Sequence, residues 1–305
     1  MVESRCWDVV TDDGVRLEVE TWPARRPDAP LVLGIHGIAA NRRAFLPLIA
    51  ALDGDVEFVA FDCRGRGGSD KPADPARYGH GRHALDAACV LAAAGRRADA
   101  LMGQSMGAWN GLLLAADRPD LVGALVLGDG GYFTDLPDGV EPAAYVESVM
   151  GAGWSQRLAM VVPSREMLVT ALRSAPPYRD LWGPDLEAMF DHGLETLPDG
   201  SVRNRCSVEG VVFDSTDYFT PREAPYVRAA LPRVTCPVHL VRAERGFDLS
   251  PETREPLLPT AAVEEFRRAL PQLVVETVPD TTHYTVNFGP AGVVALAEAI
   301  RKAVR

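Results

Sequence analysis

The chain has 305 residues, of which 47% are hydrophobic and 24% are charged, and its formal net charge is −11. These proportions are typical of a globular protein with a buried core. The acidic balance argues against binding to nucleic acid or to anionic membrane surfaces, because both need clustered Lys and Arg.

Apolar runs of strand length alternate with amphipathic segments of helix length along the N-terminal part of the chain. The stretch RLEVETW follows the turn signal DDG, and this predicts the second strand of a hairpin. Continuous apolar runs predict strands buried on both faces at residues 31–37, 56–63, 99–104 and 123–129. Helical spacing between these runs predicts helices at residues 43–52, 83–95 and 108–119.

The pattern changes between residues 132 and 233, which are rich in Pro and Gly and show short helical pieces without buried-strand runs. Strand-like runs resume at residues 237–244 and 273–280, and a helix is predicted at residues 292–304. Alternation of strands and helices predicts an α/β fold with a mostly parallel central sheet and helices on both faces. We therefore expect one α/β core, residues 1–131 and 234–305, that carries an inserted helical lid, residues 132–233.

Ser105 lies in the pattern Gly103-Gln104-Ser105-Met106-Gly107, between a predicted buried strand and a predicted helix. A G-x-S-x-G turn in that context holds the serine in a strained conformation that exposes its hydroxyl. Glycine is needed at both flanking positions, because side chains there would collide with the neighbouring strand and helix. We therefore expect Ser105 to be a nucleophile rather than an idle loop serine.

A serine hydroxyl is a weak nucleophile and needs a base within hydrogen-bonding reach. His283 follows the last predicted strand, so it is expected at the same carboxyl-terminal sheet edge as Ser105. His239 falls inside a predicted strand, His192 lies in the predicted lid, and His36 is expected to brace its loop by hydrogen bonds. His283 is therefore the predicted catalytic base.

The acid that orients the imidazole has three candidates in the sequence. Asp248 follows the strand at residues 237–244 on the expected edge and is the first choice. Glu244 lies closer to the end of that strand, and Asp129 follows the earlier strand at residues 123–129. All three remain open at this stage.

An oxyanion site needs two N–H donors. The amide of Met106 at the start of the predicted helix is one candidate, and the amide of Ile38 in the loop after residues 31–37 is the other. Neither an H-x-H nor an H-E-x-x-H spacing occurs, and the scattered cysteines form no C-x-x-C pair. We therefore predict chemistry without a metal or cofactor.

Four stretches in this order, HGIAANRRAF, FDCRGRGGSDKP, GQSMGAW and THYTVNFG, resemble the α/β-hydrolase superfamily. The similarity is to its lid-bearing esterase, lactonase and C–C hydrolase branches, and it covers roughly residues 14–131 and 232–304. The resemblance implies the α/β-hydrolase fold and a triad in the order Ser105, Asp248, His283. The serine at residue 105 excludes the branches whose nucleophile is aspartate.

These observations predict a serine hydrolase that cleaves a carboxylic ester or lactone of a small, partly apolar molecule through an acyl-enzyme. Hydrolysis of a C–C bond, or another acyl transfer, on the same triad is the alternative, and a non-catalytic ligand-binding protein of this fold is a further one. The expected partner is a small-molecule substrate, and a homodimer is left open. We expect a cytoplasmic protein, because the first residues show no secretory signal pattern and no apolar run reaches about 18 residues.

Overall fold

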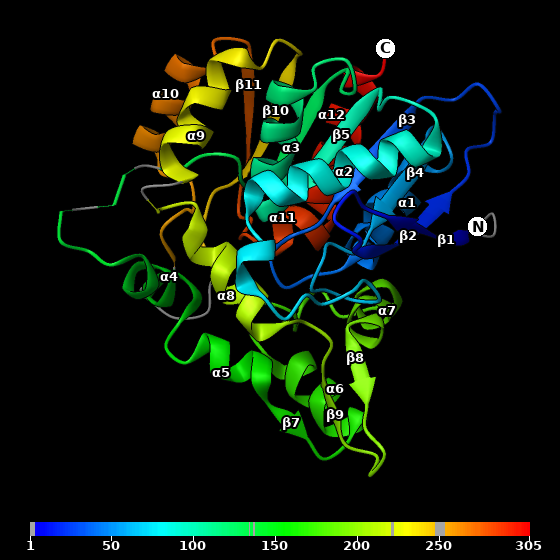
Figure 1. Cartoon of the computed structure of the whole chain (residues 1–305), viewed down its shortest axis with the longest axis vertical. Helices are drawn as coiled ribbons and strands as arrows, with labels where there is room; N and C mark the ends of the chain where they lie inside the picture. The colour runs from blue at the N-terminus through cyan, green and yellow to red at the C-terminus, as the bar shows by residue number, and fades with distance from the viewer. Residues whose placement is uncertain (1–3, 134, 137, 221–222, 248–253) are drawn as a thin grey trace.

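The computed structural model describes residues 4–133, 135–136, 138–220, 223–247 and 254–305. Its centre is an eight-stranded sheet with the strand order β1-β2-β4-β3-β5-β6-β10-β11 (Figure 1). The strands are β1 Arg5–Val10, β2 Arg16–Trp22, β3 Leu31–Ile35, β4 Glu57–Phe61, β5 Ala100–Gln104, β6 Leu125–Gly128, β10 Val238–Ala243 and β11 Leu273–Val278.

The sheet is mostly parallel. β1 pairs with β2 and β2 with β4 in antiparallel register, whereas the pairs from β4 to β11 are parallel. Every residue of β3, β5 and β6 is buried, as expected for strands covered on both faces. The loops after β3, β5, β6 and β11 therefore open at one edge of the sheet, where ligands bind in such folds.

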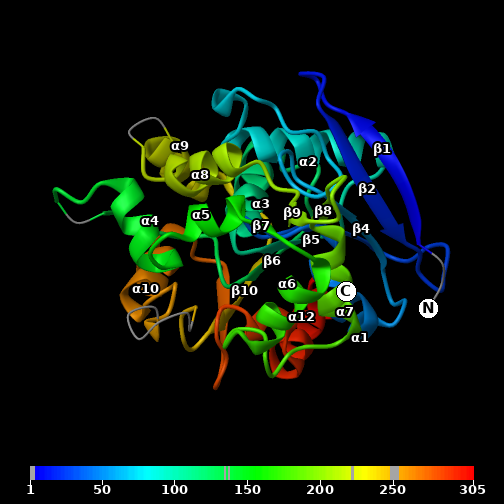
Figure 2. The same cartoon turned by 90° about the horizontal axis from the view of Figure 1, so that it is seen from below.

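Helices cover both faces of the sheet, as Figure 2 shows most clearly. One face carries α2 and α3, and the other carries α1 and α12. Successive side chains of β6 point to opposite faces of the sheet. Leu127 packs in the core beneath α3, and Val126 packs in the core beneath α12. The helices of this part are α1 Leu46–Leu52, α2 His80–Ala94, α3 Met106–Asp117, α10 Thr260–Ala269, α11 Thr285–Phe288 and α12 Pro290–Ala303.

The segment between β6 and β10 forms most of the lower part of the molecule in Figure 1. It also contains a small antiparallel sheet in the order β7-β9-β8, which the prediction of a helical lid did not include. These strands are two or three residues long, too short to show an alternating apolar pattern. The elements are α4 Pro142–Met150, α5 Trp154–Ala159, β7 Val161–Val162, α6 Arg165–Ser174, α7 Pro184–His192, β8 Leu194–Thr196, β9 Val202–Asn204, α8 Val208–Asp217 and α9 Glu223–Ala230.

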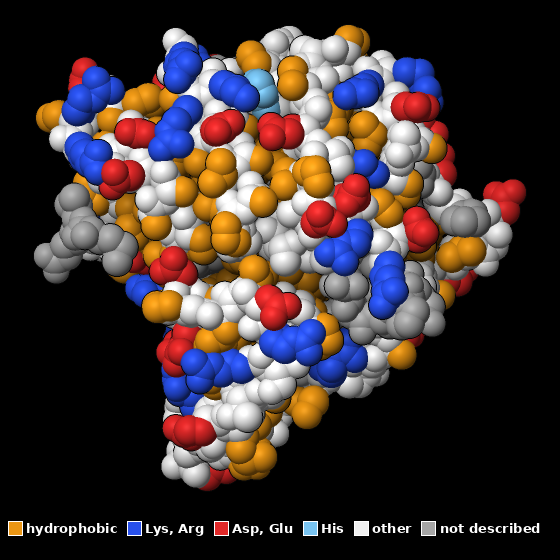
Figure 3. Space-filling model, turned by 180° about the vertical axis from the view of Figure 1, so that it is seen from behind, with side chains coloured by type: hydrophobic (Ala, Val, Ile, Leu, Met, Phe, Trp, Pro, Cys, Tyr) orange, Lys and Arg blue, Asp and Glu red, His pale blue; other side chains and the backbone are white. Residues whose placement is uncertain are grey.

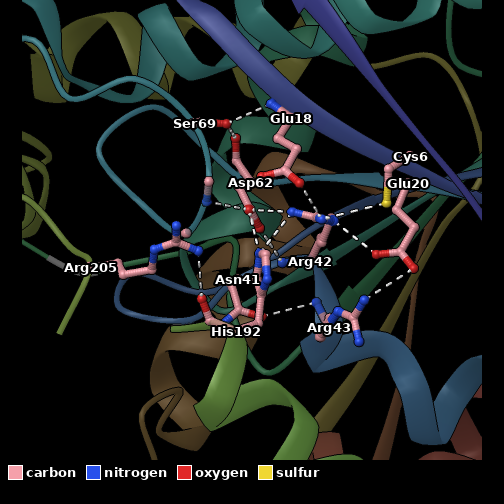
Figure 4. Close-up of polar contacts among 12 residues, drawn as sticks. Cys6, Glu18, Glu20, Asn41, Arg42, Arg43, Asp62, Ser69, His192 and Arg205 are labelled. Carbon is pink, nitrogen blue, oxygen red and sulfur yellow. Dashed lines mark hydrogen bonds and ion pairs between the residues drawn. The ribbon is translucent and has the colours of Figure 1, made fainter. Parts of the chain in front are cut away.

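A buried ion-pair cluster joins this segment to the main sheet (Figure 4). The Arg42 guanidinium contacts Glu18, Glu20 and Asp62, each within 2.9 Å. The ring of His192, at the end of α7, lies 2.7 Å from Asp62. Burial opposes ionisation of Asp62, but the His192 hydrogen bond and the Arg42 charge lower the pKa of its carboxyl below the ordinary value. The Gly-rich turn after β4, which comprises residues 62–70, therefore anchors α7 to the sheet.

The surface carries both signs of charge in a mixed arrangement on the face shown in Figure 3. Apolar side chains are scattered among the charged ones on this face, and its lower part narrows to the end formed by the segment between β6 and β10. No helix in the described part of the chain combines the length and the apolar character that crossing a membrane requires.

Candidate active site

Ser105 occupies the sharp turn between β5 and α3. Its φ is 51° and its ψ is −118°, a strained conformation for a residue with a side chain. A Cβ at Gly103 would overlap the backbone of Gly107 and Ala108, and a Cβ at Gly107 would overlap the carbonyl oxygen of Ile35. Both flanking positions therefore require glycine, as the pattern predicts.

His283 lies in the loop after β11 and faces Ser105. Its Nε2 atom is 3.1 Å from the Ser105 Oγ atom, within hydrogen-bonding reach of the hydroxyl. The backbone amide of His283 donates to the Gly246 carbonyl, and its ring packs on Phe247 with 4.4 Å between centroids. The predicted nucleophile and base are thus brought together, with the backbone of His283 bonded to Gly246 and its ring packed on Phe247.

Asp129 is the carboxylate next to the imidazole. It follows β6 directly, and its Oδ2 atom is 2.7 Å from the Nδ1 atom of His283. Its Oδ1 atom accepts a hydrogen bond of 2.9 Å from the Ala243 amide, and the side chain is fully buried. Both oxygens of the Asp129 carboxylate therefore have a hydrogen-bonding partner. Because Asp129 binds the Nδ1 side of the imidazole, the Nε2 atom of His283 faces Ser105.

The other two candidates for the acid are placed differently. Glu244 is on the surface side of the same edge, where its carboxylate accepts a hydrogen bond from the Asp280 amide. Asp248, the first choice from the sequence, lies outside the described residues. Among the described residues, the carboxylate that contacts the Nδ1 atom of His283 is that of Asp129.

The loop after β3 lies against the nucleophile. A Cβ at Gly37 would come within 3.4 Å of the Ser105 Cβ atom, so this loop approaches the serine closely. The Gly37 carbonyl accepts from His36 Nδ1 at 2.7 Å and from the Ala40 amide at 3.1 Å. Since N–H and C=O of a trans peptide point in opposite directions, the Ile38 amide points away from the His36 ring.

His36 braces this loop, as its position before Gly37 suggests. Its Nε2 atom accepts from the Cys63 amide at 3.0 Å, which leaves the proton on Nδ1 for the Gly37 carbonyl. Burial lowers the pKa of His36 to about 4, although the nearby Asp62 charge opposes the shift. The ring is therefore neutral and fixed in one tautomer at neutral pH.

The second predicted donor, the Met106 amide, is at the first position of α3, where helical amides have no partner within the helix. Neither the Ile38 nor the Met106 amide donates a hydrogen bond to another described residue. Both residues line the cavity at Ser105. The arrangement is suited to hold a negatively charged oxygen beside the serine.

A cavity of about 200 Å³ opens over Ser105 and His283. One of its walls is an aromatic cluster in which Trp109 stacks on Phe133 at 4.3 Å. The lining also includes Tyr284, whose ring centroid lies 5.1 Å from that of Tyr178 and 5.8 Å from that of Phe247. Trp109 is buried in the core and also lines this cavity.

A second group of ligand-type atoms lies away from this cavity. Oxygen and nitrogen atoms of Glu18, Asp62 and His192 lie within 4.8 Å of one another. The Arg42 guanidinium lies among them, 2.8 Å from the His192 Nε2 atom and hydrogen-bonded to both acids. Because that cation already lies between these groups and binds both acids, we assign the cluster a structural role.

Comparison with known proteins gives three relevant findings. The model of the alpha/beta hydrolase family matches residues 32–296. The chain is 29% identical over 261 residues to 2-(acetamidomethylene)succinate hydrolase of Mesorhizobium japonicum, a match that covers 86% of this chain and 84% of that protein. The crystal structure of E-2-(acetamidomethylene)succinate hydrolase superposes with a TM-score of 0.77 and 25% identity, covering 99% of both chains.

A shorter match adds a second named activity. The putative carbamate hydrolase RutD of Klebsiella pneumoniae is 39% identical over 108 residues, which is 35% of this chain and 40% of that protein. The proteins to which this chain is similar are thus named as hydrolases. Together with the parallel sheet and its strand order, these matches confirm the α/β-hydrolase fold that the sequence predicts.

Proposed function

This chain belongs to the alpha/beta hydrolase family, and we propose that it is a serine hydrolase that cleaves a carboxylic ester or lactone through an acyl-enzyme. The observation that carries the proposal is the row of hydrogen-bonded side chains Asp129, His283 and Ser105, with contacts of 2.7 and 3.1 Å. A nucleophile, a base and an orienting acid in this geometry activate the serine hydroxyl.

In the proposed reaction Ser105 Oγ attacks the carbonyl carbon while its proton passes to His283 Nε2. Asp129 stabilises the imidazolium, and the amides of Ile38 and Met106 hold the oxyanion. Collapse of this intermediate expels the alcohol, which takes the proton from His283. Water then attacks the acyl-enzyme with the same base, and the carboxylic acid is released.

The residues that line the cavity favour an uncharged substrate with apolar groups on both sides of the reacting bond. Its walls are mostly aromatic and aliphatic side chains, and of the described residues that line it none is Lys or Arg. A carboxylate that loses its water there would lack a cationic partner, which is costly. A substrate named as a succinate, as for the Mesorhizobium japonicum relative, carries such carboxylates, so we propose a different substrate class here.

The test is the intact mass of the protein after treatment with a fluorophosphonate, with Ser105→Ala and His283→Ala as matched variants. We expect one phosphonyl group on the wild type and none on Ser105→Ala, with labelling of His283→Ala at least about 100-fold slower. A well-folded wild type that stays unlabelled would contradict the proposal and favour the non-catalytic binding protein.

A substrate panel then separates the bond types. It contains p-nitrophenyl butyrate, γ-butyrolactone, an anilide and a β-diketone, because hydrolases of C–N and C–C bonds use the same kind of triad. We expect the ester or the lactone to give the highest kcat/KM. A higher kcat/KM for the diketone or the anilide would indicate that the enzyme cleaves a C–C or a C–N bond instead. The proposed roles of the triad residues would be unchanged.

A further inference from the structure

The Gly-rich turn after β4 holds two arginines that the catalytic proposal does not use, Arg64 and Arg66. Both side chains are fully buried, and both are paired with buried carboxylates. They differ in what else they contact. Arg64 binds Asp86, Asp13 and the Arg77 carbonyl, none of which belongs to the described lining of the cavity. Arg66 instead reaches the loop that carries Ile38.

The Nε atom of Arg66 donates to the Ile38 carbonyl at 2.8 Å. The Gly37 carbonyl on the preceding peptide is held by His36 and Ala40. The peptides on both sides of the Ile38 Cα atom are thus fixed by hydrogen bonds. Because these peptides define the backbone angles of Ile38, the direction of its amide is set before any substrate arrives.

Arg66 is itself held from the segment between β6 and β10. Its Nη1 atom lies 2.6 Å from the Oδ2 atom of Asp214 on α8, and both side chains are fully buried. The other Asp214 oxygen accepts from the Gly79 amide at 2.7 Å, and His83 Nε2 lies 2.8 Å from Oδ2. Asp214 and Ile38 also line the cavity at Ser105.

We propose that Arg66 is a positioning residue for the oxyanion site, fixing the Ile38 peptide and coupling it through Asp214 to helix α8. This inference rests on the proposed function, because it needs Ile38 to donate to the oxyanion. Arg66 does not touch the reacting atoms. We expect the Ile38 amide to point towards the oxyanion position beside Ser105 only while the Asp214–Arg66 contact holds α8 against the Gly-rich turn.

The test compares Arg66→Lys with Arg64→Lys, two conservative changes in one turn. Lysine keeps the charge but cannot donate in two fixed directions, as the guanidinium does. For Arg66→Lys we expect kcat on p-nitrophenyl butyrate to fall about 10- to 100-fold, with KM changed by less than about threefold. Arg64→Lys is expected to lower thermal stability and to leave kcat unchanged.

A readout at the oxyanion separates positioning from general loss of structure. Ser105 adds to the carbonyl of a trifluoromethyl ketone, its proton passes to His283, and the ketone oxygen becomes the bound oxyanion. Affinity for 1,1,1-trifluoro-2-hexanone should fall with kcat in Arg66→Lys and stay at the wild-type value in Arg64→Lys. Equal effects of the two changes on this affinity would overturn the inference.

Asp214→Asn distinguishes position from charge, with Asp86→Asn as its matched control. If the Arg66 charge alone stabilised the oxyanion, removal of its counter-charge would strengthen ketone binding, and that result would also overturn the inference. Positioning predicts weaker binding in Asp214→Asn and no change in Asp86→Asn. If Arg66→Lys does not fold, Asp214→Asn tests the positioning role in its place. A wild type that neither reacts with a fluorophosphonate nor binds the ketone would instead overturn the proposed function itself.

Discussion

The Nδ1 atom of His283 is 2.7 Å from the Oδ2 atom of Asp129, and in the proposed mechanism this carboxylate orients the imidazole. Asp129→Asn should therefore lower kcat about 10³- to 10⁴-fold, because an amide at this position favours the wrong imidazole tautomer. Steady-state kinetics on an activated ester measures the loss, and circular dichroism checks that the fold is retained.

Two further carboxylates provide the controls for this prediction. Glu244→Gln and Asp248→Asn should each keep kcat within about threefold of the wild type, since the Nδ1 atom of His283 already has its acceptor in Asp129. A large loss in Asp248→Asn together with an active Asp129→Asn would reverse the assignment. The same p-nitrophenyl ester serves for all three variants.

The apolar cavity predicts discrimination against charged acyl groups. p-Nitrophenyl hemisuccinate should react with a kcat/KM at least about 10-fold below that of p-nitrophenyl valerate, a near-isosteric ester without the carboxylate. The reason is that the described lining offers no Lys or Arg to pair with the buried charge. Alkaline hydrolysis of both esters corrects for intrinsic reactivity, and equal corrected values would refute the proposed substrate class.

The ion-pair cluster at Arg42 predicts a large difference between two adjacent arginines. Arg42→Met should cost about 3–5 kcal/mol of unfolding free energy, because Glu18, Glu20 and Asp62 would lose their shared cation. Arg43→Met should cost less than about 1 kcal/mol, because the ion pair between Arg43 and Glu20 is 3.6 Å long and the Arg43 side chain is 35% exposed. Urea unfolding of both variants measures the contrast, and similar midpoints would contradict it.

His36 predicts a pH dependence of stability. Its pKa is lowered to about 4 in the folded protein by burial, below its ordinary value of 6.5. Between these values the unfolded chain binds a proton that the folded chain does not, so stability falls as pH falls from about 6.5 to about 4. Over the whole interval between the two pKa values, His36 therefore lowers the unfolding free energy by about 3 kcal/mol.

The measurement is the unfolding free energy of the wild type and of His36→Gln at pH 7 and pH 5. The wild type should lose more stability than the variant over this interval. The carboxyls of Asp62 and Asp214, whose pKa values are lowered by their cationic partners despite burial, lose their contribution only at more acidic pH. Parallel pH curves for the two proteins would show that His36 is not the group responsible.

Much of the sheet was predictable because its strands are continuous apolar runs bounded by turn residues. The runs at residues 31–37, 99–104 and 123–129 correspond to β3, β5 and β6, with ends that differ by one or two residues. The turn at Ser105 was predictable for the same reason, since a G-x-S-x-G pattern between a buried run and a helix has few other uses. His283 followed from its place after the last strand.

Other features depend on tertiary contacts that no local pattern shows. The choice of Asp129 depends on β6 lying between β5 and β10 in the sheet, which brings its end beside both Ser105 and the loop after β11. One local signal was available, because Asp129 precedes two glycines at the end of a fully buried strand. The pairing of Arg66 with Asp214 joins residues far apart in the chain, and nothing in the sequence distinguishes Arg66 from Arg64.

The backbone of Ser105 carries a consequence for how this protein can adapt. A residue held at φ 51° and ψ −118° costs the fold free energy that only a glycine would avoid. The strained backbone at Ser105 thus lowers the stability of the fold while it exposes the serine hydroxyl. Selection for heat tolerance alone would favour glycine there, and under the proposed mechanism the more stable protein would lack its nucleophile.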